Sequence, residues 1–404
     1  MIYDFDKIVN RSGSDDLKHH VLKTRYGRDD LIPLWVADMD FETPDFILDA
    51  LRDRLKHPIS GYTVEPHDLW PTVCSWILNH HDWNVNPRWL SYIPGVVKGI
   101  GMAINALTIP GDKVVIQTPV YHPFRMAVEG NGRQVVVNPL KESQGDSFYE
   151  MDFEHLLSVI DGCKLLILCN PHNPAGIAWR TESLLRLDSI CHLHGVIVLS
   201  DEIHADLALF GHKHVPFATV SAEAEQISIT FQAPTKTFNM AGIVSSYAIV
   251  PNDDLRRKFF GWIGANELNE PNIFAPIATI AAFKHGEDWR RQMLRYVEHN
   301  ILFVEQFVAE HIPAIRVVRP ESSFLVWLDC RQLGLNHDDL LDLFVNKARL
   351  ALNDGEIFDT DANPYAPMHN LHSAGRGFMR LNVGTPLCIL RQAMAQLACA
   401  AGGL

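Results

Sequence analysis

The sequence predicts an α/β protein, with a mostly parallel sheet covered by helices in a large domain and a smaller α+β domain. Two observations lead to this prediction. Short apolar runs rich in β-branched residues recur between about residue 110 and residue 250, and most are separated by stretches long enough for a crossover. These runs are apolar throughout instead of alternating, as in strands of a parallel sheet that is buried on both faces.

The expected elements follow one another along the chain. Helical periodicity is seen at residues 44–55, 69–77 and 96–107, and the apolar runs lie at 114–116, 135–137, 165–168, 196–199, 227–231 and 247–250. One long helix is expected over residues 286–310, followed by a strand at 324–328. We therefore expect a large domain at residues 46–285. Residues 1–45 and 286–404 are expected to form the small domain together.

The composition limits the classes of function. The chain has 404 residues, of which 47% are hydrophobic and 21% charged, values typical of globular proteins. Its formal net charge is −13 and it has no run of lysines or arginines, which argues against a nucleic-acid-binding face. No apolar stretch is long enough to span a membrane, so no membrane partner is expected.

The cysteines and the N-terminus favour a cytoplasmic protein. The seven cysteines are odd in number, form no C-x-x-C pair, and several lie in apolar runs, as buried reduced thiols do. The first residues have neither the basic nor the apolar region of a signal peptide.

Polar side chains follow four of the expected strands at the point where each ends. Tyr121 follows the first strand, Asn173 the third, Asp201 and His204 the fourth, and Lys236 the fifth. Ligands of open α/β sheets bind beyond the carboxyl ends of the strands, so these side chains are expected to converge at one edge. Each alone has an ordinary explanation, such as an N-cap for Asp201 or an Asx turn for Asn173. Their joint placement favours a functional site.

Lys236 is the residue of this set with the most specific surroundings. It lies between Thr235 and Thr237 and is followed by Phe238 and Met240, with no other charge close by. Loss of solvation in such surroundings lowers the pKa of a lysine and makes its amine available for a Schiff base. Taken alone, the stretch fits an exposed loop lysine better. The neighbours at the sheet edge favour the reactive amine.

This combination is what a pyridoxal phosphate site requires. Lys236 forms the Schiff base, Asp201 keeps the pyridine nitrogen protonated, Tyr121 stacks on the ring and the amide of Asn173 bonds the ring hydroxyl. The phosphate requires backbone amides at a helix N-terminus, which the stretch 95–97, with Val96 and Val97, offers.

A substrate carboxylate requires an arginine, and Arg380 is the candidate. It lies in a strand-like stretch at residues 377–384, and its guanidinium can bind a carboxylate in bidentate fashion. The alternative role of Arg380 is a surface salt bridge.

With these residues in view, the chain resembles the fold-type I pyridoxal phosphate enzymes over nearly its whole length. Within them it is most similar to the MalY/PatB-type cystathionine β-lyases, also called cysteine-S-conjugate β-lyases. The motifs that carry this resemblance are Trp35-Val-Ala-Asp-Met-Asp-Phe41, Gly61-Tyr-Thr63, Pro94-Gly-Val-Val97, Tyr121-His-Pro-Phe124, Asn170-Pro-His-Asn-Pro174, Ser200-Asp-Glu-Ile-His204, Thr235-Lys-Thr-Phe-Asn239 and Phe378-Met-Arg-Leu-Asn382.

Three departures separate the chain from aminotransferases of this class. His204, Val244 and Ala233 stand where those enzymes usually carry a tyrosine, a phosphate-binding arginine and a serine, and the β-lyase group shares all three substitutions. The resemblance therefore implies that Val96, Val97, Thr235 and Tyr62 bind the phosphate. Tyr62 is expected to come from a partner subunit, which implies an obligate homodimer with shared active sites.

The function implied is cleavage of L-cystathionine or a related cysteine S-conjugate to a thiol, pyruvate and ammonia. Lys236 is the expected general base, Tyr121 stacks and takes part in proton handling, and His204 tunes the ring. Arg380 holds the α-carboxylate with backbone near Ala37 and Asp38. The alternatives are an aminotransferase that uses the same lysine and aspartate, and a cofactor-bound regulatory protein.

Other patterns are set aside. Residues 359–377 are longer than the usual connection before the arginine. Within them His369 and His372 have near-metal spacing without a third ligand, so no metal is expected. Gly99-Ile-Gly101 lacks the third glycine of a dinucleotide fingerprint and follows no expected strand, which favours helix packing.

Overall fold

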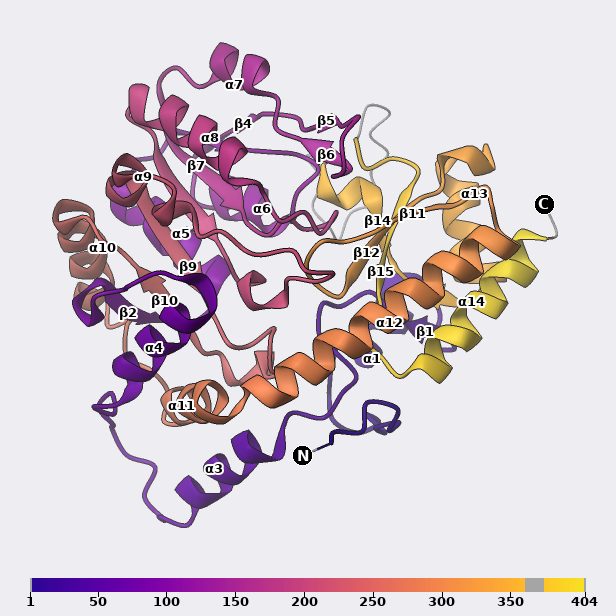
Figure 1. Ribbon diagram of the computed structural model, residues 1–404, viewed down its shortest axis with the longest axis horizontal. Helices are drawn as coiled ribbons and strands as arrows, with labels where there is room; N and C mark the ends of the chain where they lie inside the picture. The colour runs from indigo at the N-terminus through magenta and orange to yellow at the C-terminus, as the bar shows by residue number, and fades with distance from the viewer. Residues whose placement is uncertain (1, 360–373, 403–404) are drawn as a thin grey trace.

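A seven-stranded sheet forms the centre of the larger part of the molecule (Figure 1), with strand order β2-β10-β9-β8-β7-β3-β4. The computed structural model describes residues 2–359 and 374–402. The strands are β2 (Leu90–Ile93), β3 (Lys113–Ile116), β4 (Gln134–Val137), β7 (Cys163–Cys169), β8 (Ile197–Asp201), β9 (Ser228–Gln232) and β10 (Ser246–Ile249). β4, β3, β7, β8 and β9 pair in parallel, while β10 is antiparallel to β9 and β2. The predicted mostly parallel sheet is confirmed.

The six apolar runs all form strands, but β2 was not expected. Its four residues include Ser91 and lie at the sheet edge, so neither length nor periodicity distinguishes them from a loop. Helix α5 (Val96–Leu107) therefore follows a strand of the sheet, whereas the sequence indicated no strand before Gly99. The packing role expected for Gly99 is confirmed, since a Cβ there would lie 2.4 Å from Cδ1 of Ile93.

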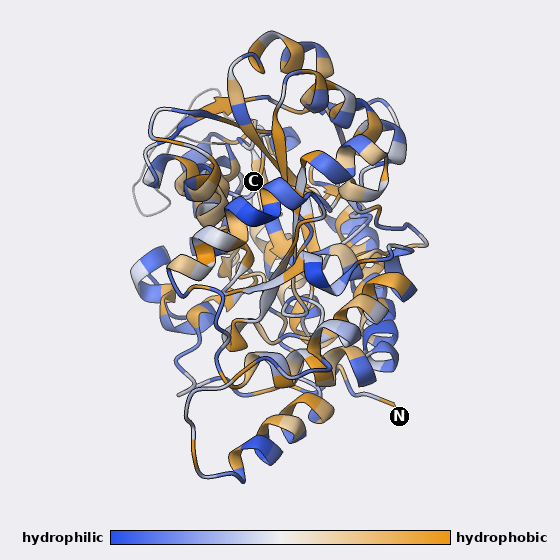
Figure 2. Cartoon of the chain, turned by 90° about the vertical axis from the view of Figure 1, so that its left-hand side faces the viewer, coloured by the Kyte–Doolittle hydropathy of each residue, from blue (hydrophilic) through white to orange (hydrophobic). Residues whose placement is uncertain are grey.

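Helices cover both faces of this sheet because successive residues of each strand point to opposite sides. Leu165 and Ile167 of β7 pack with α5, α6 (Pro123–Gly130) and α10 (Asp253–Ala265). Leu166 and Leu168 pack instead with α7 (Phe153–Val159), α8 (Thr181–Leu193) and α9 (Ala222–Ile227). Each such leucine contributes roughly 1.5–3 kcal/mol by leaving water. Figure 2 shows the same division, with apolar strands inside and polar helix faces outside.

A second sheet is antiparallel, with order β11-β12-β15-β14. Its strands are β11 (Arg316–Val318), β12 (Leu325–Asp329), β14 (Asn353–Asp354) and β15 (Phe378–Asn382), and the nearby helices are α12 (Glu287–His311), α13 (His337–Asp342) and α14 (Leu387–Ala401). In Figure 1 the long α12 (orange) runs beside α14 (yellow). The predicted helix over 286–310 is confirmed, with buried positions Trp289, Met293, Val297, Ile301, Val304 and Val308.

The N-terminal segment packs against this second part, as expected. Strand β1 (Ile32–Pro33) pairs in parallel with β13 (Leu350–Ala351). The other short elements are α1 (Leu17–His20), α2 (Leu22–Tyr26), β5 (Lys141–Glu142) and β6 (Tyr149–Glu150).

Three helices cover the lower left of the molecule in Figure 1, namely α3 (Asp45–Leu55), α4 (Leu69–His81) and α11 (Ala275–His285). The expected boundary at 285/286 falls between α11 and α12. The apolar core continues across it, since the ring centroids of Phe238 and Trp289 are 5.9 Å apart. The division into two domains stays a prediction. None of the helices within residues 2–359 and 374–402 is long and apolar enough to cross a membrane.

Candidate active site

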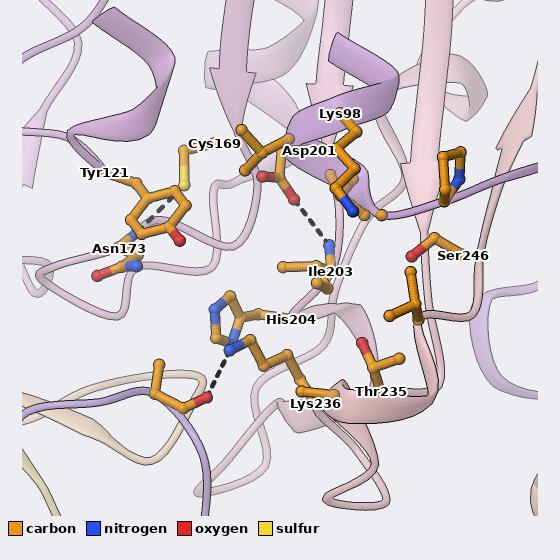
Figure 3. A pocket seen from close by; sticks show the side chains of 17 residues that line it. Lys98, Tyr121, Cys169, Asn173, Asp201, Ile203, His204, Thr235, Lys236 and Ser246 are labelled. Carbon is orange, nitrogen blue, oxygen red and sulfur yellow. Dashed lines mark hydrogen bonds between the residues drawn. The ribbon is translucent and has the colours of Figure 1, made fainter. Parts of the chain in front are cut away.

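A cavity of about 290 Å³ opens at the carboxyl edge of the seven-stranded sheet. Side chains that the sequence placed after separate strands meet there, as Figure 3 shows. The predicted residues around this cavity are Ala37, Val96, Val97, Tyr121, Asn173, Asp201, His204, Thr235 and Lys236.

Lys236 lies in the turn that follows β9, where the backbone N–H of Phe238 donates to Pro234 O at 3.0 Å and that of Met240 to Thr235 O at 3.0 Å. Its ammonium donates a hydrogen bond to the backbone carbonyl of Ala37 (Figure 3). Burial lowers the pKa of Lys236 to about 8. The expected loss of solvation is confirmed, and the exposed loop lysine is excluded.

Two asparagines position the Ala37 segment against the lysine. Asn239 Nδ2 donates to the carbonyls of Met39 at 2.9 Å and Phe41 at 2.6 Å. Asn382 Nδ2 donates to the carbonyls of Val36 and Asp38, each at 2.6 Å. Because both amides bond backbone groups, they fix the segment whatever its side chains are.

Asp201 is the last residue of β8 and is 4% exposed. Its Oδ1 accepts a hydrogen bond from the backbone N–H of Ile203 at 3.1 Å. Burial raises the pKa of Asp201 to about 7, although the nearby charge of Lys236 opposes this shift, and no described residue lies within ion-pair distance of its carboxylate. A buried carboxylate without a counter-ion is costly, so this position favours a cationic ligand group.

His204 follows on the same loop and is also buried. Burial lowers its pKa to about 3, so the imidazole is neutral at physiological pH. Its Nδ1 has no hydrogen-bond partner within the described part of the chain.

Tyr121 and Asn173 form the wall of the cavity that lies across from Lys98 and Ser246 (Figure 3). Burial raises the pKa of the Tyr121 phenol. The backbone N–H of Asn173 donates to Cys169 Sγ at 3.3 Å, which fixes the loop after β7. The side chains of Tyr121 and Asn173 therefore reach the cavity from two neighbouring strands, β3 and β7.

Arg380 lies on β15, behind Asn173, and is 3% exposed. Its Nη1 donates to Asn173 Oδ1 at 2.9 Å and its Nη2 to the carbonyl of Trp35 at 2.9 Å. The guanidinium carbon lies 5.0 Å from the ring centroid of Phe358. Burial lowers the pKa of Arg380 to about 10. The surface salt bridge considered for this residue is wrong, since Arg380 is buried.

The charge of Arg380 has no carboxylate partner among residues 2–359 and 374–402. Its Nε has no hydrogen-bond partner there either. A buried guanidinium that lacks a carboxylate partner favours the binding of an anionic ligand.

Three predicted residues do not line the cavity, namely Arg380, which reaches Asn173 from behind, Tyr62 and Asp38. Tyr62 is fully exposed on the segment between α3 and α4. The carboxylate of Asp38 accepts a hydrogen bond from Arg11 Nη2 at 2.8 Å, and both residues line a neighbouring cavity of about 490 Å³. His369 and His372 lie outside the described residues.

The cavity also contains residues that the sequence reading did not select, namely Lys98, Cys169, Ile203, Ala241 and Ser246. Lys98 lies in the first turn of α5, directly after the phosphate-binding amides expected at Val96 and Val97, and this proximity in sequence was the signal that could have identified it. Ser246 is the first residue of β10, which is antiparallel. It could not be predicted from the rule that ligands bind beyond the carboxyl ends of parallel strands, because it lies at the amino end of its strand.

Comparison with known families gives the identity of this arrangement. The profile of the family "Aminotransferase class I and II" matches residues 29–387. The chain belongs to this family. Cystathionine β-lyase PatB of Bacillus subtilis is 41% identical over 399 residues, covering 98% of this chain and 99% of PatB.

Two solved structures of this family resemble the chain over nearly their whole length. Cystalysin from Treponema denticola, which contains a pyridoxal 5′-phosphate cofactor, matches with a TM-score of 0.92 and 30% identity, covering 100% of both chains. The pyridoxal-phosphate-bound C–S lyase from Staphylococcus hominis matches with a TM-score of 0.88 and 29% identity, covering 99% of this chain and 98% of the lyase. The fold-type I class and the resemblance to β-lyases are thereby confirmed.

Proposed function

We propose that the chain is a pyridoxal 5′-phosphate-dependent carbon–sulfur β-lyase that cleaves L-cystathionine or a related cysteine S-conjugate to a thiol, pyruvate and ammonia. One structural observation carries the proposal. A desolvated lysine and a buried carboxylate without an ion-pair partner meet at one sheet edge, and a buried arginine without an ion-pair partner reaches Asn173 at that edge from the second sheet. The likeness to PatB and to the C–S lyases supports the reaction.

The described residues fit this cofactor. The uncompensated carboxylate of Asp201 matches a protonated pyridine nitrogen, and the Lys236 amine matches the aldehyde. Helix α5 has no side-chain cap and no acidic residue in its first turn, so the amides of Val96 and Val97 are available for the phosphate. When bound, pyridoxal phosphate draws electrons from the α-carbon of an amino acid and so makes removal of its proton feasible.

Two side chains act on the substrate in this proposal. Arg380 binds the α-carboxylate and thereby orients the α-carbon. Lys236 Nζ then takes the α-proton, and its lowered pKa leaves part of the amine neutral near physiological pH. The bond between the β-carbon and sulfur breaks, and the sulfur leaves with the bonding pair as a thiolate. The remaining three-carbon product is aminoacrylate, which tautomerises to an imine, and water hydrolyses this imine to pyruvate and ammonia.

The other walls of the cavity position the reactants. Tyr121 offers a ring face and a phenol with a raised pKa, which keeps a proton available for the leaving thiolate. Asn173 joins Arg380 to the cofactor position through its amide. The neutral His204 tunes the ring without neutralising Asp201.

The proposal includes a homodimer with shared sites. Tyr62 is exposed together with Ile59 and Val64 on one segment, and a phosphate-binding tyrosine from the partner requires such a projecting segment. A cytoplasmic location is also proposed, on the ground that all seven cysteines are free thiols.

The test is product formation without a keto acid. The purified protein is incubated with L-cystathionine alone, and pyruvate, ammonia and free thiol are measured. The proposal predicts equal amounts of all three. If no pyruvate forms, and amino-group transfer appears only after a keto acid is added, the chain is an aminotransferase and the proposal is wrong.

A further inference from the structure

We propose that Lys98 binds the phosphate group of the cofactor. From helix α5 it supplies the positive charge that aminotransferases of this family usually place at the position of Val244. The inference rests on the proposed function, because it requires a cofactor that carries a phosphate. Lys98 belongs to none of the motifs given above and has no role in the proposed mechanism.

The Lys98 side chain folds back along the first turn of α5. Its Cδ lies 3.8 Å from the place that a Cβ on Gly95 would occupy. Side chains on a helix tilt toward its N-terminus, and here Gly95 leaves the stem room to do so. Figure 3 shows Lys98 on the α5 wall, with its nitrogen turned into the cavity. Lys98 is exposed as a whole, and its ammonium lies near the end of the helix where the backbone amides are free.

This position is electrostatically unfavourable for a lysine in the absence of an anion. A helix N-terminus carries a partial positive charge, which a cation in the first turn opposes. The first turn of α5 has no acidic residue, and Lys98 forms no ion pair with any residue that the structure describes. The partial positive charge of the α5 N-terminus and the charge of the Lys98 ammonium therefore repel each other at this wall. A bound phosphate dianion would relieve this repulsion.

Two largely buried residues with hydroxyl groups mark the same wall as a ligand site. Thr235 is 6% exposed and Ser246 is 3% exposed, and both line the cavity. Neither hydroxyl has a hydrogen-bond partner within the described ranges. Both hydroxyls border the cavity and are therefore available to a ligand. Together with the amides of Val96 and Val97, they are suited to the oxygens of a phosphate.

Val244 cannot supply the positive charge that a phosphate requires, so a cation other than Lys236 is needed at this wall. It lines the cavity with an apolar side chain and a left-handed backbone, with φ of 59°. Of the described residues around the cavity, only Lys98 and Lys236 carry cationic side chains, and Lys236 is taken by the Schiff base. Among the described lining residues, Lys98 is therefore the cationic side chain left to neutralise the phosphate.

The test compares two probes, pyridoxal 5′-phosphate and pyridoxal, which lacks the phosphate. The cofactor is removed from the holoenzyme, and the equilibrium affinity for each probe is measured by fluorescence. We expect Lys98→Met and Lys98→Gln to weaken pyridoxal phosphate binding by about tenfold or more, since a hydrogen bond to a charged group is lost. Pyridoxal binding is expected to stay within about twofold of wild type, and Lys98→Arg is expected to restore phosphate binding.

The matched control is Lys113→Met. Lys113 is exposed and begins β3 at the opposite edge of the sheet, so its loss lowers the net charge equally without touching the cavity. Unchanged pyridoxal phosphate affinity in both Lys98 variants would overturn the inference, as would an equal loss for both probes. A wild-type protein that binds neither probe would overturn the proposed function as well.

Discussion

Arg380 donates a hydrogen bond from Nη1 to Oδ1 of Asn173 at 2.9 Å and so joins the second sheet to the edge of the first. Arg380 lies on β15, whereas Asn173 follows β7. The proposed carboxylate-binding and cofactor-binding groups are therefore in direct contact. Substrate binding and ring position are expected to depend on each other through this bond.

Replacing Arg380 by lysine is expected to raise KM for cystathionine strongly. A lysine cannot reproduce the bidentate geometry of the guanidinium, and we expect kcat/KM to fall about a hundredfold. Steady-state kinetics measure the effect. The control is Arg316→Lys, an exposed arginine on β11 of the same sheet, which should leave both constants unchanged. An unaltered KM in Arg380→Lys would contradict the assignment.

Asp201→Asn is expected to stabilise the cofactor-free chain at alkaline pH while abolishing most activity. The folded pKa of Asp201 is raised from 3.8 to about 7, so its contribution to stability is present below the unfolded value and is lost as the pH rises through the folded value. Asparagine does not ionise, so the variant does not lose this free energy of unfolding, which amounts to at most about 4 kcal/mol. Urea unfolding at about pH 5 and about pH 8 measures it; a wild-type chain as stable as the variant at the higher pH would refute the prediction.

Asp206 is expected to behave in the opposite way. It accepts hydrogen bonds from Trp76 Nε1 at 3.0 Å and Thr237 Oγ1 at 3.2 Å, and it pairs with His81 Nε2 at 3.0 Å. Despite burial, these partners hold the pKa of Asp206 below its usual value. Its contribution is present above the unfolded pKa and is lost as the pH falls through the folded one. Asp206→Asn should therefore destabilise the protein by about 2 kcal/mol near neutral pH, as measured by urea unfolding.

Mixing two inactive variants tests the shared active site. Tyr62→Ala lacks the proposed phosphate contact, and Lys236→Ala lacks the base. If Tyr62 acts across the dimer, hybrids contain one complete site, and random mixing restores about a quarter of wild-type activity. Activity is assayed after the subunits have been allowed to exchange. Mixtures that stay inactive despite confirmed exchange would show that Tyr62 does not act in the partner's site.

The sequence was sufficient for most of the sheet. Six strands, five of them parallel and the antiparallel β10, were recognisable because they are apolar runs, as illustrated by the buried Val198 and Ile229. Strand β2 was not recognisable, because it is short, lies at the edge and contains Ser91. Its pairing with β10 is a contact between distant segments that local periodicity does not report.

Site residues near the carboxyl ends of parallel strands were predictable from the sequence, whereas the surroundings of the other site residues were not. Asp201 ends a parallel strand, and Asn173 and Lys236 each follow one within four residues, so topology alone brings them together. The absence of a carboxylate partner for Arg380 depends on what packs around β15, which no motif encodes. The same holds for Lys98, whose orientation depends on the conformation of its side chain over Gly95.

The most direct test of the account is the position of the cofactor on the chain. Borohydride reduction of the holoenzyme fixes any Schiff base, and peptide mapping by mass spectrometry then locates it. The account predicts that the cofactor is attached to the peptide that contains Lys236, and that Lys236→Ala carries none. Attachment at Lys98 or at any other lysine, or the absence of reducible cofactor from the wild-type protein, would contradict it.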